Sequence, residues 1–386
     1  MPELKRSPDR ERLLDAVRQI APTLEACAAE AEAMRRLPQP AVDAMLAADL
    51  FRCGAPREVG GLEADPVTQT EVFEAVTAVE SNSGWNLMIG AIWSVWLGSR
   101  LPDEGAAALY NADAWPIVAG LIWPYGHARP DGEAAYKVTG RWKFGSGIHQ
   151  AAWVASGCQI IEGGGPRLAP NGMPINLITV VPQAQVTIHD TWHTAGLRGT
   201  GSNDYSVEDR DVSAGFTMMP IGGPVLRGGA WWRLPALFLA APGHSGFALG
   251  IAKRCLDEVK HLGDRRRYVS PSRQAERESV QMELGRRMAE YEAVRLFVMN
   301  HYADCIVKGE RGEVPLGRPV NAYATEMAVR CAEFAYKVMG GESVYESSPV
   351  QRYLRDILAA QQHVAASDAT FALYGRAALE AAATST

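Results

Sequence analysis

Apolar residues at three- and four-residue spacing mark the first part of the chain as helical. The first stripe comprises Leu13, Leu14, Val17, Ile20 and Leu24. Such spacing places the side chains on one face of a helix. Similar patterns predict helices over 41–50, 67–79 and 103–110, and the stretch 83–96 is apolar on most sides. Residues 1–114 are therefore predicted to form an N-terminal helical domain.

The pattern changes near residue 115. Residues 116–123 are uncharged and rich in β-branched side chains, and residues 136–144 alternate with period two, which is typical of strands. Further strand candidates cover 153–161, 175–181, 185–188 and 205–212. Short strands separated by Gly/Pro turns predict a middle β-domain, a small barrel or sandwich, over residues 115–222.

Helical spacing returns after residue 229 and persists. Four stretches carry it, at 231–262, 270–307, 319–339 and 348–379, and the third ends at Gly340-Gly341. Four long amphipathic segments predict a C-terminal four-helix bundle over residues 223–386. The fold class is α+β: helical domain, β-domain, helical bundle.

Composition narrows the function. A net charge of −6 gives no support to a nucleic-acid or membrane surface. The six cysteines are scattered without metal-ligand spacing, which predicts reduced thiols in a cytoplasmic protein and no metal site. The nucleophile-elbow, zinc-protease and phosphate-loop motifs are absent, which counts against the corresponding hydrolase, zinc-enzyme and kinase functions.

The segment Gly196-Leu-Arg-Gly-Thr-Gly-Ser202 is the most unusual in composition. Its three glycines allow the backbone to approach a planar or anionic ligand closely. Gly-rich segments are more often simple turns, so the string alone does not decide between a turn and a binding loop.

Three passages together resemble a known family. They are Gly140 to Trp153, Thr191 to Asp204, and Gly340 to His363. Their content and order resemble the acyl-CoA dehydrogenase fold, and the chain is most similar to the oxygenase components of two-component flavin-dependent monooxygenases of the 4-hydroxyphenylacetate hydroxylase type.

The resemblance also separates two chemistries. An acyl-CoA dehydrogenase needs a carboxylate base, and residues 357–364 contain none after Asp356. The monooxygenases have a His at the position of His363. On a continuous helix, Asp356, Ala360, His363 and Ser367 would share one face, with room for a ligand beside the imidazole. A buried core histidine is the alternative reading of His363.

The resemblance implies a set of site residues. His363 and Ser146 are the expected catalytic residues, and Ser146 occupies the place of a flavin-contacting Thr. The expected cofactor contacts are Trp142, Phe144, Ser146, Leu197, Arg198, Thr200, Ser202, Arg267, Gly340 and Gly341. The expected substrate contacts are Trp85, Trp93, Trp123 and His149.

The resemblance further implies the activity. A separate flavin reductase would supply reduced FMN or FAD, and O2 would form a flavin C4a-hydroperoxide that hydroxylates an aromatic or similarly electron-rich small molecule. A homotetramer is expected. Two alternatives stay open: an FAD-dependent dehydrogenase or oxidase with a substrate unlike acyl-CoA, and a flavin-binding helical oligomer without turnover.

Overall fold

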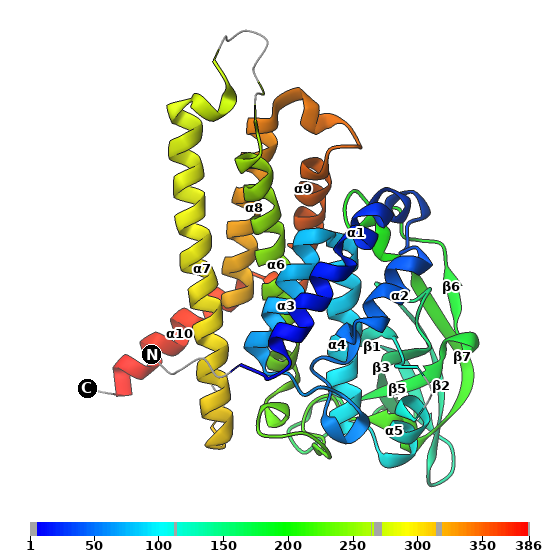
Figure 1. Ribbon diagram of the computed structural model, residues 1–386. Helices are drawn as coiled ribbons and strands as arrows, with labels where there is room; N and C mark the ends of the chain where they lie inside the picture. The colour runs from blue at the N-terminus through cyan, green and yellow to red at the C-terminus, as the bar shows by residue number, and fades with distance from the viewer. Residues whose placement is uncertain (1–5, 112–113, 264, 266–271, 314–318, 385–386) are drawn as a thin grey trace.

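The computed structural model describes residues 6–111, 114–263, 265, 272–313 and 319–384. Helices fill one side of the molecule and a β-sheet the other, with the first helices between the sheet and the long C-terminal helices (Figure 1). The α+β class and the order of helices, strands and helices are as the sequence predicts.

Five helices precede the sheet. They are α1 (Arg10–Met34), α2 (Gln39–Ala47), α3 (Pro66–Val79), α4 (Ser81–Arg100) and α5 (Asp103–Tyr110). Carboxylates cap two of them: Asp65 accepts hydrogen bonds from the backbone at the start of α3, and Glu80 does the same for α4. The α4 helix is buried along almost its whole length, which explains its apolar sequence on all sides.

Eight strands form the sheet. They are β1 (Val118–Pro130), β2 (Ala135–Trp142), β3 (Trp153–Glu162), β4 (Gly165–Pro166), β5 (Asn176–Pro182), β6 (Thr187–His189), β7 (Asp204–Ser213) and β8 (Thr217–Met218). The hydrogen-bonded order is β6-β7-β2-β1-β3-β5-β8, with β4 paired to β3. Among the described strands, β1 and β3 pair in parallel and the other pairs are antiparallel. Trp142 and Tyr205 stack at 5.3 Å between ring centres in the core of this domain.

The described residues of the C-terminal part form the α-helices α6 (Ala236–Lys260), α7 (Glu278–Glu310), α8 (Val320–Met339), α9 (Pro349–Ala360) and α10 (Ala369–Thr384). The first three and α9 pack together, whereas α10 runs away from the sheet and past α7 (Figure 1). The prediction of one helix over 348–379 is wrong at residues 361–368. His363 there has extended backbone, with φ −74° and ψ 142°, and starts a short 3-10 turn.

That break also corrects the expected helix face. Asp356 lies within α9 and is buried, but His363 lies beyond its end, so the two residues do not share a helix face with Ser367. The physical reason is local. The His363 imidazole accepts a hydrogen bond from the backbone N–H of Ala365, and this cap competes with helix continuation.

Candidate functional site

A cavity of about 310 Å³ lies between the sheet and the end of α9. Five aromatic side chains line it: Trp85, Trp123, Tyr125, Phe144 and Trp192. Its polar lining among the described residues is Ser146, Ser202, Gln362 and His363. The volume lies at the lower end of the range for small-molecule sites, and flat apolar walls with a few polar groups are typical of them. The described lining contains no Asp, Glu, Lys or Arg.

The glycine-rich loop forms one wall of this cavity because it is wedged against α9. A Cβ atom on Gly196 would lie 2.0 Å from the carbonyl oxygen of Arg355, so only glycine fits there. The next residue, Leu197, adopts φ +53°, an uncommon conformation for a side chain of this type. Its backbone N–H donates to the Asp356 carboxylate at 2.5 Å, and the Gly199 N–H donates to the Asn82 side chain at 2.9 Å.

Asp356 joins this loop to the first helical domain. Its carboxylate also accepts a hydrogen bond of 2.5 Å from the Ser81 hydroxyl at the start of α4. The side chain is fully buried, and burial raises the pKa of the Asp356 carboxyl to about 7 although both hydrogen bonds oppose the shift. Asp356 therefore holds the loop, and the structure gives it no place in the lining of the cavity.

Hydroxyl groups run in a chain behind the cavity wall. The Ser146 and Ser202 hydroxyl oxygens are 2.7 Å apart, and those of Ser202 and Thr200 are 2.6 Å apart. The Trp85 indole N–H donates to Ser146 at 3.1 Å at one end. At the other end the Thr200 hydroxyl donates to the carbonyl of Leu197 at 2.8 Å.

His363 is held from two directions. The Nδ1 atom accepts a hydrogen bond of 3.2 Å from the backbone N–H of Ala365. A neutral imidazole that accepts at Nδ1 carries its proton on Nε2, so the ring can offer a donor to a ligand. The ring stacks on His244 of α6 with 4.3 Å between ring centres, and the Trp85 ring packs edge-on against both histidines.

Burial keeps both imidazoles neutral. It lowers the pKa of His363 to about 4, and it lowers the pKa of His244 well below its ordinary value, with repulsion from His363 adding to the shift. At neutral pH His363 is an uncharged hydrogen-bond donor at the cavity.

Most of the predicted contacts converge on this cavity. Ser146, Phe144, Leu197, Ser202, Trp85, Trp123 and His363 all line it. Thr200 lies directly behind, in contact with Ser202. The sequence segments that supply these residues are far apart in the chain, and the fold brings them to one place.

Other predicted residues lie elsewhere. Trp142 is fully buried and donates its indole N–H to the carbonyl of Gly157 at 2.7 Å, so it is a core residue and cannot cover a ligand. Trp93 is buried against Trp96 within α4 and is absent from the cavity lining. Each burial has a local reason. β2 ends at Trp142 and the backbone of Phe144 adopts φ +60°, so the chain leaves the strand between these two aromatic residues. Trp93 lies about two turns beyond Trp85 on α4, which is buried along almost its whole length.

The remaining expected cofactor contacts do not line the aromatic cavity among the described residues. Gly340 and Gly341 precede α9, whereas the cavity lies past its end, and the 12 residues of that helix span about 18 Å. Arg198 is half-buried, absent from the cavity lining, and has no hydrogen bond or ion pair to the described residues. Arg267 lies outside the described residues. Cofactor contacts by these residues remain predictions.

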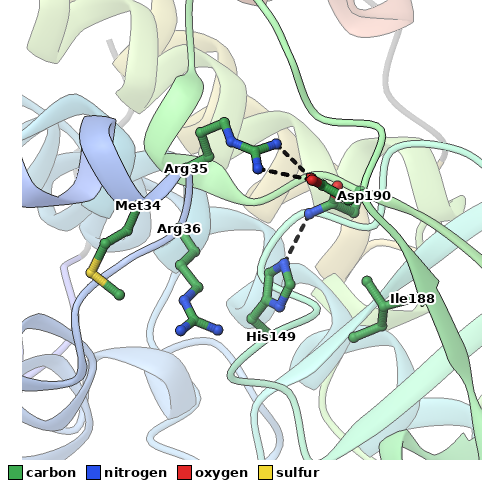
Figure 2. A pocket seen from close by; sticks show the side chains of 7 residues that line it. Met34, Arg35, Arg36, His149, Ile188 and Asp190 are labelled. Atoms are coloured by element: carbon green, nitrogen blue, oxygen red, sulfur yellow. Dashed lines mark hydrogen bonds and ion pairs between the residues drawn. The ribbon is translucent and has the colours of Figure 1, made fainter.

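His149 faces a different cavity, of about 450 Å³, whose described lining shares no residue with the aromatic cavity (Figure 2). Arg35 and Arg36 lie on one side of it, with Asp190 bound to Arg35 at 2.5 and 3.0 Å. The Asn203 amide donates to His149 Nε2 at 2.8 Å, and burial lowers the pKa of the imidazole. His149 therefore lines this second cavity and not the aromatic one, and its contact with substrate remains a prediction.

The sequence analysis missed several lining or supporting residues. Trp192, Tyr125 and Gln362 line the aromatic cavity, and His244 supports His363 from behind. An ionisable side chain within the uncharged run 234–252 was the available signal for His244, because buried histidines concentrate at functional sites. No comparable signal singled out the other three.

The part of the chain that the structure describes contains no cluster of His, Cys, Asp and Glu suited to a metal ion. It also contains no helix long and apolar enough to cross a membrane. The aromatic walls and the hydroxyl chain fit a flavin: Phe144 is 56% exposed and Trp123 49%, so broad apolar faces are available to a planar ring. The fold and site thus define a flavoprotein with the acyl-CoA dehydrogenase architecture.

Comparisons with known proteins agree. Residues 7–97 match the acyl-CoA dehydrogenase N-terminal domain, and residues 242–368 match the acyl-CoA dehydrogenase C-terminal domain. Indole-3-acetate monooxygenase of Pseudomonas putida is 30% identical, with 95% of this chain and 92% of that protein covered. The oxygenase component of FADH(2)-dependent resorcinol hydroxylase of Rhizobium sp. is 25% identical, with coverage of 95% and 94%. The chain belongs to the flavin-dependent monooxygenases with the acyl-CoA dehydrogenase fold, as an oxygenase component.

Solved structures share the whole fold. The crystal structure of 3-HSA hydroxylase from Rhodococcus sp. RHA1 superposes with a TM-score of 0.86 at 23% identity, covering 96% of this chain and 97% of that one. XiaF from Streptomyces sp., solved in complex with FADH2 and glycerol, gives a TM-score of 0.79 at 23% identity, with coverage of 95% and 94%. These structures show the fold; the sequence relatives above show a flavin-dependent monooxygenase that uses reduced flavin and molecular oxygen.

Proposed function

We propose that this oxygenase hydroxylates a neutral aromatic molecule in the cavity between the sheet and α9. The observation that supports this is the lining itself: five aromatic side chains, four polar uncharged ones, and no Asp, Glu, Lys or Arg among the described residues. A carboxylate on the substrate would lose its hydration there without a cation to replace it, which is costly. Two of the relatives act, by their names, on indole-3-acetate and resorcinol. Both compounds support an aromatic ring in the substrate, but only resorcinol is neutral; indole-3-acetate carries a carboxylate, so the restriction to neutral molecules rests on the lining of this cavity alone.

In this proposal Phe144 would hold the flavin ring and Ser146 would bind its N5 edge, since both line the cavity. Reduced flavin supplies the activation of O2 once it is bound. The protein's own residues hold the ring and substrate and exclude water, which limits competing release of hydrogen peroxide. The Nε2–H of His363 donates a hydrogen bond to the oxygen that gains charge during transfer.

A dehydrogenase is the weaker alternative. Removing a proton from carbon requires a base at the ligand, and the described lining of the cavity holds no carboxylate. The nearest one in the sequence, Asp356, is occupied by Ser81 and by the Leu197 backbone. Its carboxyl therefore serves the loop and is not free to act on a substrate.

The partners follow from the chemistry. A separate flavin reductase supplies the reduced cofactor, which is FMN or FAD, and the oxygenase acts in the cytoplasm as a homotetramer. Each subunit comprises three domains: the helical domain over residues 1–114, the β-domain over residues 115–222 and the helical bundle over residues 223–386. These statements are part of the proposal and rest on the resemblance and on the element order.

Incorporation of oxygen from ¹⁸O2 tests the function. Purified protein receives chemically reduced FMN, ¹⁸O2 and a panel of matched pairs, such as indole with indole-3-acetate and phenol with 4-hydroxybenzoate. Mass spectrometry should find one ¹⁸O atom in products of the neutral member, at a yield per flavin at least about tenfold above that of the charged member. Preferred hydroxylation of the carboxylates would refute the neutral-substrate proposal, and a protein that oxidises substrate without ¹⁸O incorporation would be a dehydrogenase.

A further inference from the structure

The hydroxyl chain behind the cavity has only one possible direction. Its first member, the Trp85 indole N–H, can only donate, and its last member, the Leu197 carbonyl, can only accept. The Thr200 hydroxyl donates its single proton to that carbonyl, so Thr200 must accept a hydrogen bond from Ser202. Because Ser202 donates its proton to Thr200, it must accept a hydrogen bond from Ser146.

Ser146 is therefore left without a proton for a ligand. Its hydroxyl accepts from Trp85 and donates to Ser202, and a hydroxyl oxygen has one donor and two acceptor positions. One lone pair is left, on a residue that lines the cavity. The Ser146 hydroxyl can therefore meet a ligand in the cavity only as an acceptor.

We infer that this directional chain selects reduced over oxidised flavin. The inference rests on the proposed placement of the flavin N5 edge at Ser146. In reduced flavin N5 carries a hydrogen and can donate to the free lone pair. In oxidised flavin N5 carries only a lone pair, which would face another lone pair with no proton between them. The buried chain fixes this preference before any ligand arrives, because none of its members can turn without breaking a hydrogen bond.

The chain is well protected from water. Thr200 and Ser202 are 1% and 2% exposed, and Ser146 is 7% exposed. The Leu197 carbonyl at its end is also fixed, since it accepts from the Trp192 indole N–H at 2.9 Å. A reversal of the chain would leave donors and acceptors unpaired in a dry environment, which costs far more than the same change at the surface.

Thr200→Val tests the inference directly. Valine keeps the shape of the side chain but removes the acceptor for Ser202. Ser202 can then donate to Ser146, and Ser146 can donate to oxidised N5. Fluorescence quenching measures the Kd of oxidised FMN, and anaerobic ultrafiltration measures the Kd of dithionite-reduced FMN. The Kd of oxidised FMN divided by the Kd of reduced FMN gives one ratio for each variant. This ratio should fall about tenfold in Thr200→Val, chiefly through tighter binding of oxidised FMN.

Two variants complete the test. Ser202→Ala also releases the Ser146 proton and should lower the ratio in the same way, so it serves if the valine variant does not fold. Thr200→Ser keeps the hydroxyl and should leave the ratio at the wild-type value. A general loosening of the site would weaken both redox forms together and leave the ratio unchanged. An unchanged ratio in both Thr200→Val and Ser202→Ala overturns the inference while flavin binding itself persists; absence of reduced-flavin binding in the wild type would instead overturn the proposed function.

Discussion

The Ala365 backbone N–H decides what His363 can do, because it occupies Nδ1 and leaves Nε2–H for the cavity. His363→Asn separates these two tasks. The Asn side-chain oxygen can still accept from Ala365, as Asn does at helix starts, but no donor reaches the position of Nε2. We expect product per reduced flavin to fall about 10- to 100-fold, with hydrogen peroxide rising in its place and FMN affinity nearly unchanged.

The pH profile of the wild type gives a second measure of the same residue. Because burial lowers the pKa of His363 to about 4, the ring stays neutral from pH 8 down to about pH 5. The ratio of product to peroxide should therefore hold across this range. A loss of coupling centred near pH 6.5, the ordinary imidazole value, would contradict the donor assignment.

Asp356 gives a stability prediction whose sign can be worked out. The pKa of its carboxyl is about 7 in the folded protein against 3.8 when exposed, so the folded state binds the proton more tightly. Between pH 4 and pH 7 the folded state holds more protons, and its stability falls as pH rises. A pKa shift of this size lowers the free energy of unfolding by about 4 kcal/mol at a pH above 7, relative to a pH below 4.

Asp356→Asn removes this titration while keeping the shape and an acceptor for Leu197. The free energy of unfolding of the wild type minus that of the variant should decrease from pH 5 to pH 8. Taking the difference cancels the opposite contribution of His363, whose lowered pKa makes stability rise with pH between about 4 and 6.5. Urea unfolding at pH 5 and pH 8 measures this difference in the free energy of unfolding. A difference that increases with pH would show that the folded protein favours the ionised form of Asp356.

The sequence predicted part of the site and missed the rest for a physical reason. Ser146 and His363 stand in recognisable strings, and both reach the cavity. Trp142 stands in the same string as Ser146, yet it is the last residue of β2 and packs in the core, whereas the chain turns at Phe144, with φ +60°, before it reaches Ser146. His244 packs on His363 across a gap of more than a hundred residues in sequence, and a contact of that kind depends on tertiary packing that no local pattern records.

At the scale of helices, α3 and α7 are joined by charged side chains. Arg295 of α7 pairs with Glu74 at 2.9 Å and with Glu71 at 3.3 Å, and both carboxylates are buried. Burial raises the pKa of Glu74, while Arg295 and the Tyr291 hydroxyl oppose the shift. This pairing explains how two Glu residues can lie on the buried face of α3.

Arg295→Ala should be strongly destabilising because it removes the cation that pairs with the buried Glu74, whereas Glu71 keeps Arg6 and Arg10. Loss of one partner from a buried ion pair costs about 3–5 kcal/mol. Arg286→Ala on the same helix is the matched control. Arg286 is exposed and pairs with Glu283, and such surface pairs contribute about 0–1 kcal/mol. Thermal or urea unfolding of both variants compares them; equal losses would mean that the α3–α7 ion pairs contribute no more than a surface pair.

Helix periodicity predicted the helical segments well but not the end of α9. Residues 348–379 keep an apolar pattern throughout, so the pattern extends one helix across 361–368. The structure ends α9 at Ala360 and continues with a 3-10 turn capped by His363. Periodicity reports which residues prefer burial, whereas a cap depends on one side chain and one backbone N–H. His363, the proposed hydrogen-bond donor, lies at this break.

At the scale of the whole molecule, the C-terminal helix exposes a large apolar surface. Leu373 and Leu379 of α10 are 61% and 75% exposed, and α10 projects from the body past α7 (Figure 1). On α7, Met282 and Leu296 are 59% and 56% exposed. Scattered surface leucines need no explanation, but a projecting helix with two of them suits burial in another copy of the chain.

We expect the double variant Leu373→Glu/Leu379→Glu to dissociate the proposed tetramer. The introduced charges would have to be buried in the interface, which is unfavourable, so the tetramer should dissociate. The measured mass should fall from four times 41.8 kDa to a lower multiple of it. Ala378→Glu is the matched control, because residue 378 is also exposed but, at 100° per residue, lies on the opposite side of α10. Light scattering after size exclusion measures the mass. A wild-type monomer, or a double variant with unchanged mass, would show that α10 does not hold the subunits together, and the apolar surface of α10 would then need another explanation.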